Sequence, residues 1–177
     1  MASVALGAAE ASRALRGYED RLAVAAINDP GSVVLSGETQ AMDELVASLQ
    51  QQGVHCRLLP VNYAFHSPQM APLASEFSLA LGQVRAQRSA LPMYSTVLGA
   101  TVEGPELEAA YWARNIREPV QLCRALELAT ADRYRVFVEV GPGGTLTASA
   151  MRHPKWSERH RAVRLMRHHA QSRNDRD

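Results

Sequence analysis

The residues best placed to do chemistry lie in the hexapeptide YAFHSP, residues 63–68. His66 comes directly before Ser67 and Pro68, a pair that commonly opens a helix with serine as the N-cap and proline at the first helical position. The partial positive charge at a helix N-terminus disfavours imidazolium, so we expect His66 to stay neutral near pH 7 and to be able to act as a general base. The alternative is a buried, hydrogen-bonded histidine with a structural role at a strand-to-helix corner. Spacing alone leaves both interpretations open.

A second candidate is the glycine-rich turn GPGG, residues 141–144, which follows the apolar run YRVFVEV. Glycines between a strand and a helix can hold a phosphate on backbone N–H groups, or they can simply form a tight turn. A plain turn is favoured because neither a Lys-Ser/Thr pair nor a complete dinucleotide-binding glycine motif is present.

The cysteines and the C-terminal histidines give weaker signals. Cys56 and Cys123 each stand alone in an apolar stretch, which is typical of small buried side chains in a reducing compartment. Four histidines near the C-terminus lack cysteine or carboxylate partners at regular spacing, so we expect a solvated tail and no metal site. These histidines are His153, His160, His168 and His169.

Composition limits the function classes. The chain has 177 residues, 46% of them hydrophobic, which suits one domain or a domain with a small appendage. The net charge of +1 argues against a dedicated nucleic-acid-binding protein, although residues 151–177 carry 8 Lys/Arg and only 3 Asp/Glu. No apolar run is long enough to span a membrane and no secretion signal is recognisable. We therefore expect a cytoplasmic protein that binds neither membrane nor nucleic acid.

Residues 1–61 alternate strand and helix signals in the order β-α-β-β-α-β. Two apolar runs at 22–28 and 32–37 flank Asp29-Pro30-Gly31 and predict a hairpin. The segment 38–52 has apolar residues at helical spacing and ends before Gly53. This order predicts a ferredoxin-like subdomain over residues 1–61.

In residues 62–150 the spacing of the predicted elements differs from that in residues 1–61. We expect a helix from Ser67 to about residue 84, a strand at 91–96, short helices at 106–115 and 120–130, a fully buried strand at 134–140 and a final helix. The apolar face of the first helix comprises Met70, Leu73, Phe77, Leu81 and Val84. These elements are pieces of an α/β layer, too few to complete a doubly wound sheet. Residues 151–177 read as a basic tail, either a fraying helix or disordered.

Five stretches give the chain a family resemblance. They are AAINDPGSVVLSG (25–37), VNYAFHSPQM (61–70), LPMYSTVLGA (91–100), YWARNIREPVQ (111–121) and FVEVGPGGTL (137–146). In this order they resemble the acyltransferase domain of modular polyketide synthases and, more distantly, the malonyl-CoA:acyl carrier protein transacylases of fatty acid synthesis. The resemblance covers roughly residues 1–150. It implies an α/β (α+β) fold in which the ferredoxin-like subdomain is followed by a partial α/β-hydrolase-like layer of the malonyltransferase fold.

The resemblance also implies a mechanism and partners. In this family a serine takes an acyl group from coenzyme A and passes it to the phosphopantetheine thiol of an acyl carrier protein, through an ester intermediate. His66 matches the family's base, and Asn115 matches the asparagine whose backbone carbonyl orients it. A helix C-cap is the structural alternative for Asn115. No bound cofactor is implied, because acyl-CoA is the substrate, and the partners are the carrier protein and the rest of a polyketide synthase.

Substrate choice is implied by Phe65 and Tyr63. In this family phenylalanine at the position of Phe65 accompanies malonyl selectivity and serine accompanies methylmalonyl selectivity, because a rigid ring leaves little room for an α-methyl branch. Tyr63 departs from this pattern, since tyrosine there accompanies methylmalonyl domains. We give more weight to Phe65, the bulk nearest the base, and expect a malonyl preference.

The family's nucleophile motif, Gly-His-Ser-x-Gly, does not occur in this sequence. The nearest imitation is Ser36 in LSGE. We therefore expect the C-terminal portion of an acyltransferase domain, inactive alone because a base without its nucleophile retains only residual catalysis. Two alternatives stay open: a free-standing ferredoxin-like module that binds a partner, and a non-functional remnant of a longer gene.

Overall fold

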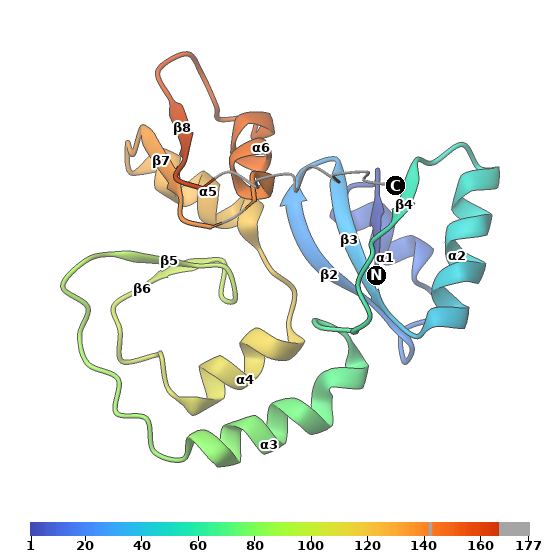
Figure 1. Cartoon of the computed structure of the whole chain (residues 1–177), viewed down its shortest axis with the longest axis horizontal. Helices are drawn as coiled ribbons and strands as arrows, with labels where there is room; N and C mark the ends of the chain where they lie inside the picture. The colour runs from blue at the N-terminus through green and yellow to red at the C-terminus, as the bar shows by residue number, and fades with distance from the viewer. Residues whose placement is uncertain (142, 167–177) are drawn as a thin grey trace, which may run out of the picture.

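The computed structural model describes residues 1–141 and 143–166. Its first part is a four-stranded antiparallel sheet in the order β2-β3-β1-β4, with two helices (Figure 1). This is the ferredoxin-like arrangement that the sequence predicts. Its elements are β1 (Ala2–Val4), α1 (Ala8–Ala14), β2 (Leu22–Asp29), β3 (Ser32–Gly37), α2 (Thr39–Gln51) and β4 (Cys56–Leu58).

One face of this sheet carries the main hydrophobic core. Val33 and Leu35 alternate along β3 and are fully buried against both helices. The predicted apolar stripe of α2 is confirmed, because all four of its residues are buried in this cluster. They are Met42, Leu45, Val46 and Leu49.

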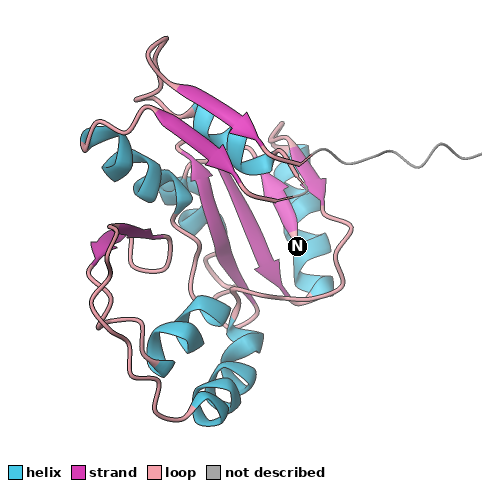
Figure 2. Ribbon diagram, turned by 60° about the vertical axis from the view of Figure 1, so that its left-hand side comes forward, coloured by secondary structure: helices cyan, strands magenta, loops and turns pink. Residues whose placement is uncertain are grey.

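The second part of the chain is built from helices and two separate strand pairs. Strands β5 and β6 form an antiparallel hairpin, whereas β7 and β8 form a separate parallel pair (Figure 2). The elements are the 3-10 helix η1 (Pro68–Met70), α3 (Ala71–Leu81), β5 (Met93–Ser95), β6 (Ala100–Val102), α4 (Ala109–Arg117), α5 (Leu122–Ala131), β7 (Val136–Glu139), α6 (Thr145–Arg152) and β8 (Arg161–Arg164).

Helix α3 is shorter and less buried than predicted. It ends at Leu81 because Gly82 takes a positive φ of 58°, so Val84 lies outside the helix. Leu73 and Phe77, which the apolar spacing assigns to a buried face, are exposed, and Ala74 is the buried residue. The spacing of apolar residues therefore predicts the helix correctly, but within the described residues Leu73 and Phe77 remain exposed to solvent.

The prediction that the strand near 134–140 is fully buried is wrong. Val136, Val138 and Val140 are 63%, 50% and 74% exposed, whereas Glu139 is buried. Alternate residues of a strand face opposite sides, so one face of β7 is covered and the other is open. The continuous apolar run predicts burial on both faces, as in a parallel sheet that has a covering layer on each side. The described residues cover only one face of β7.

The predicted basic tail is partly ordered structure. Helix α6 continues to Arg152, and Ala162 and Val163 belong to β8, paired in parallel with β7. Two arginines at the ends of β8 hide its strand character in the sequence. The remainder of the predicted tail, residues 167–177, lies outside the described residues.

Backbone pairing and an ion pair are among the contacts that join the two parts at β2. Val120 pairs with the edge of β2: its N–H donates to the Ala25 carbonyl, and its carbonyl accepts from the Ile27 N–H, both at 2.8 Å. The Arg152 side chain also contacts the Asp29 carboxylate at 3.2 Å. In the part of the chain that the structure describes, we find no helix with the length and apolar character to cross a membrane.

Candidate functional site

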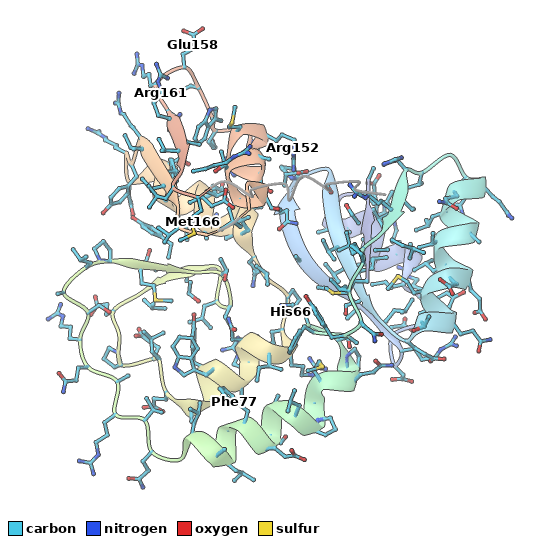
Figure 3. All side chains as sticks on the ribbon, in the orientation of Figure 1. His66, Phe77, Arg152, Glu158, Arg161 and Met166 are labelled. Atoms are coloured by element: carbon cyan, nitrogen blue, oxygen red, sulfur yellow. The ribbon has the colours of Figure 1, made fainter. Side chains whose placement is uncertain are left out.

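His66 lies where the second part of the chain meets the end of α4 (Figure 3). Its backbone N–H donates to the Ile116 carbonyl at 2.9 Å, and its φ is 62°. A left-handed conformation is unfavourable for a residue with a Cβ and is retained where the surroundings enforce it. The backbone of His66 is therefore held firmly against the C-terminal turn of α4.

The imidazole ring is held by a second bond at the same helix end. Nδ1 of His66 is 2.7 Å from the backbone carbonyl oxygen of Glu118, and the ring is half-buried. A carbonyl oxygen only accepts hydrogen bonds, so Nδ1 carries the proton and Nε2 of the neutral ring has the free lone pair. This is the tautomer that a general base acting through Nε2 requires.

The carbonyl that bonds the ring in this structure belongs to Glu118 and not to Asn115, the residue that the family resemblance implies. Asn115 lies inside α4, where carbonyls run along the helix axis, and the helix continues to Arg117. Glu118 is the first residue beyond the helix, and its ψ of 157° turns its carbonyl out of the helical direction. Pro119 explains this turn, because the residue before a proline is biased toward extended conformations. The Pro119 signal was present in the sequence and could have indicated Glu118.

Ser67 begins the next element as predicted, but its side chain does not cap it. Pro68 opens η1 directly after Ser67, and the Ser67 backbone is extended. The Ser67 hydroxyl donates instead to the Ala64 carbonyl at 2.7 Å and is buried. This bond closes the corner of the YAFHSP segment and helps to fix the backbone just before and after His66.

The two predicted selectivity residues lie beside the ring. The Phe65 and His66 ring centroids are 6.4 Å apart, and Tyr63 packs on Phe65 at 5.0 Å. Tyr63 is 55% and Phe65 36% exposed, so both present aromatic surface to solvent. The structure thus brings the rings of Tyr63, Phe65 and His66 into successive proximity, and the hydrogen bond to the His66 ring comes from Glu118 and not from Asn115.

The first turn of α6, which follows the glycine-rich turn, has two of its N–H groups occupied by the side chain of Glu139. The Glu139 carboxylate accepts from the backbone N–H of Thr147 at 2.9 Å, from its hydroxyl at 2.6 Å and from the Leu146 N–H at 3.4 Å. An internal carboxylate therefore takes the position at the helix N-terminus that a phosphate would need. This favours the tight-turn interpretation of residues 141–144.

We expect Glu139→Gln to destabilise the chain at neutral pH. The Thr147 hydroxyl and N–H hold the pKa of the Glu139 carboxyl below its usual value. A lowered folded-state pKa stabilises the fold above the unfolded-state value, and this stabilisation is lost as pH falls below about 4.5. Urea unfolding should therefore show a lower midpoint for Glu139→Gln near neutrality and a smaller difference in acid.

A matched control for this prediction is Glu158→Gln. Glu158 is exposed on the loop between α6 and β8 (Figure 3), so its substitution should leave the midpoint nearly unchanged at both pH values. Equal midpoints for wild type and Glu139→Gln at neutral pH would contradict the capping role of Glu139.

The cysteines offer little reactivity. Cys56 is buried and Cys123 half-buried, and burial raises the pKa of both thiols. A raised pKa disfavours the nucleophilic thiolate. Within residues 1–141 and 143–166, no three His, Cys, Asp or Glu side chains gather as possible ligands of one metal ion.

The sequence of the chain matches a known protein family. A family model described as the acyl transferase domain matches residues 1–172. The chain belongs to the acyl transferase domain family. Because the match extends over both the ferredoxin-like part and the segment after residue 150, it includes the strand β8 that the sequence patterns do not predict.

Individual relatives of this acyl transferase chain are polyketide synthases. It is 36% identical over 178 aligned residues to a phenolphthiocerol/phthiocerol polyketide synthase of Mycobacterium tuberculosis, covering 100% of this chain and 12% of that synthase polypeptide. The chain thus spans about an eighth of that relative's length.

Solved structures confirm the predicted fold. The acyltransferase domain from the second module of the salinomycin polyketide synthase superposes with a TM-score of 0.88 at 32% identity, over 94% of this chain and 39% of that one. The acyl-carrier-protein-S-malonyltransferase from Bartonella henselae has the same fold, with a TM-score of 0.79 at 24% identity over 93% of this chain and 53% of that one. The acyl transferase chain therefore has the malonyltransferase fold. It corresponds to about half or less of the length of each solved chain.

Proposed function

We propose that this chain supplies the general base of an acyl transfer from coenzyme A to an acyl carrier protein. His66 Nε2 takes the proton from a serine hydroxyl as the serine oxygen attacks the acyl thioester. The serine ester forms, the carbon–sulfur bond breaks, and the proton passes to the departing coenzyme A thiolate. In the second half, His66 takes the proton of the phosphopantetheine thiol, whose sulfur attacks the ester, and returns it to the serine oxygen.

The observation that supports this most is the hydrogen bond between His66 Nδ1 and the Glu118 carbonyl. A partner on Nδ1 fixes the tautomer and ring plane and stabilises the imidazolium that forms in each half-reaction. A neutral carbonyl does here what a carboxylate does in the usual triad. The left-handed backbone of His66 and its bond to Ile116 add a second constraint on where the ring lies.

We propose further that the nucleophilic serine comes from a segment other than this chain, so that the chain alone is inactive. The sequence has no Gly-His-Ser-x-Gly elbow. Its nearest imitation, Ser36, lies within β3 and is fully buried, so acyl-CoA cannot reach its hydroxyl. That this chain covers 39% of the salinomycin domain's chain is consistent with a functional unit that needs further sequence.

The proposed substrate is malonyl-CoA. The Phe65 ring centroid lies 6.4 Å from that of His66, and a rigid ring beside the base leaves less room for an α-methyl branch than a small residue would. The malonyl group would be released to the phosphopantetheine thiol of the carrier protein within a polyketide synthase.

Mass spectrometry tests the proposal in two arms. The purified chain incubated with malonyl-CoA should gain no malonyl group. A hybrid acyltransferase domain, in which this chain replaces the matching segment of a homologous domain, should form a serine ester and transfer it to a carrier protein. A stoichiometric malonyl adduct on a serine of the chain itself contradicts the proposal. So does a hybrid that folds but forms no ester, which is the result expected of a non-functional remnant or a separate binding module.

A further inference from the structure

Glu118, whose carbonyl bonds the His66 ring, forms hydrogen bonds to Arg114 through both its side chain and its backbone N–H. The Arg114 guanidinium donates to both carboxylate oxygens of Glu118, from Nε and from a terminal nitrogen, each at 2.8 Å. The Glu118 N–H also donates to the Arg114 backbone carbonyl at 2.7 Å. A two-point guanidinium–carboxylate contact fixes direction as well as distance. The side chain and the N–H of Glu118 are therefore both tied to one residue.

We infer that Arg114 is a positioning residue for His66, which rests on the proposed function of His66 as the base. Arg114 holds the side chain and N–H of Glu118, and Pro119 with the Val120–β2 pairing holds the next residues. The Glu118 carbonyl lies between these two anchors and is thereby aimed at Nδ1 of His66. In this inference Arg114 acts on His66 through this carbonyl.

The contribution of this ion pair lies in geometry, since exposed ion pairs add little to stability. The chain offers a direct comparison in Arg124 and Glu127, a pair three residues apart on α5, in contact at 2.6 Å. Both pairs join an arginine to a glutamate about one helical turn later on the surface. The Arg114 pair ends on the residue that bonds the histidine ring, and the Arg124 pair lies on another helix.

Nitrogen-15 NMR of the histidine-labelled 177-residue chain tests the inference, with the His66 signals assigned from the His66→Ala spectrum. Spectra are recorded at about pH 8, where the two nitrogen shifts of a neutral imidazole report its tautomer ratio. Wild type should show protonated Nδ1 and unprotonated Nε2. Arg114→Met keeps an unbranched apolar side chain and removes the guanidinium. Loss of a well-aligned hydrogen bond should change the ratio about two- to tenfold toward the Nε2–H form.

Arg124→Met is the matched control and should leave the His66 ratio at its wild-type value. The double variant Arg114→Glu with Glu118→Arg reverses the ion pair and should restore the ratio. A wild-type ratio in folded Arg114→Met overturns the inference, because the ion pair is then only a surface contact. If Arg114→Met does not fold, Glu118→Gln decides: it keeps the backbone carbonyl and removes the charged partner of Arg114, so an altered ratio supports the inference and a wild-type ratio overturns it. The readout needs no acyl transfer, so an inactive hybrid domain would count against the proposed function and not against this inference.

Discussion

In a hybrid acyltransferase domain that carries this chain, His66→Ala should slow acyl transfer to the carrier protein about 10²–10⁴-fold. The substitution removes the proposed base for both half-reactions, in which first a serine hydroxyl and then a thiol must lose its proton. The ring's bond to the Glu118 carbonyl shows that its orientation is specified, so a side chain without a ring nitrogen cannot substitute for it. Single-turnover formation of the serine ester, followed by mass spectrometry, measures the first half-reaction directly.

The control for His66→Ala is His55→Ala. His55 is an exposed histidine just before β4, and its imidazole makes no hydrogen bond within the described residues. Both variants should keep the circular dichroism spectrum of the parent hybrid, and His55→Ala should keep its rate. A fall of less than tenfold for His66→Ala, with the fold intact, would show that another group acts as base.

The ferredoxin-like part could be predicted from the sequence because its signals are local. The stripe of α2 and the alternation of Val33 and Leu35 each reflect a period within one element, and Asp29-Pro30-Gly31 marks the turn of one hairpin. Burial of these faces depends on elements within the first 58 residues. Local periodicity and tertiary packing therefore agree, and the predicted elements lie close to the observed ones.

The second part was harder to predict because its signals depend on contacts distant in the sequence. Strand β8 becomes recognisable through its pairing with β7, and the short strand β6 through its pairing with β5. For β7 the strand was predicted correctly but its burial was not, because one of its faces is exposed. An apolar run indicates a surface that suits burial, but it does not say whether the described chain covers it.

The candidate site shows the same division. His66 could be identified from its position before Ser67-Pro68, a local pattern, and from a family resemblance. Its hydrogen-bond partner could not be assigned by motif position, because which carbonyl faces the ring depends on where α4 ends. That end is set by Pro119 and by the pairing of Val120 with β2, a contact across almost a hundred residues.

Phe65→Ser in the same hybrid should raise the preference for methylmalonyl-CoA relative to malonyl-CoA about 10–200-fold. One methyl or methylene group in a packed pocket is worth about 1–3 kcal/mol of discrimination, and serine removes the ring that occupies the space beside His66. The ratio of kcat/KM for the two thioesters is the appropriate measure, because it compares the two substrates in the transition state. The unsubstituted hybrid should prefer malonyl-CoA.

Tyr63→Phe separates the two aromatic residues, since tyrosine at this position accompanies the opposite preference in the family. The substitution removes only the hydroxyl and retains the ring that packs on Phe65 at 5.0 Å. If bulk beside the base decides selectivity, Tyr63→Phe should change the kcat/KM ratio less than about threefold, well short of the change in Phe65→Ser. The reverse order of effects, or faster loading of methylmalonyl-CoA by the unsubstituted hybrid, would assign selectivity to Tyr63. Phe65 would then be a packing partner of Tyr63, and its ring would support the position of the tyrosine hydroxyl.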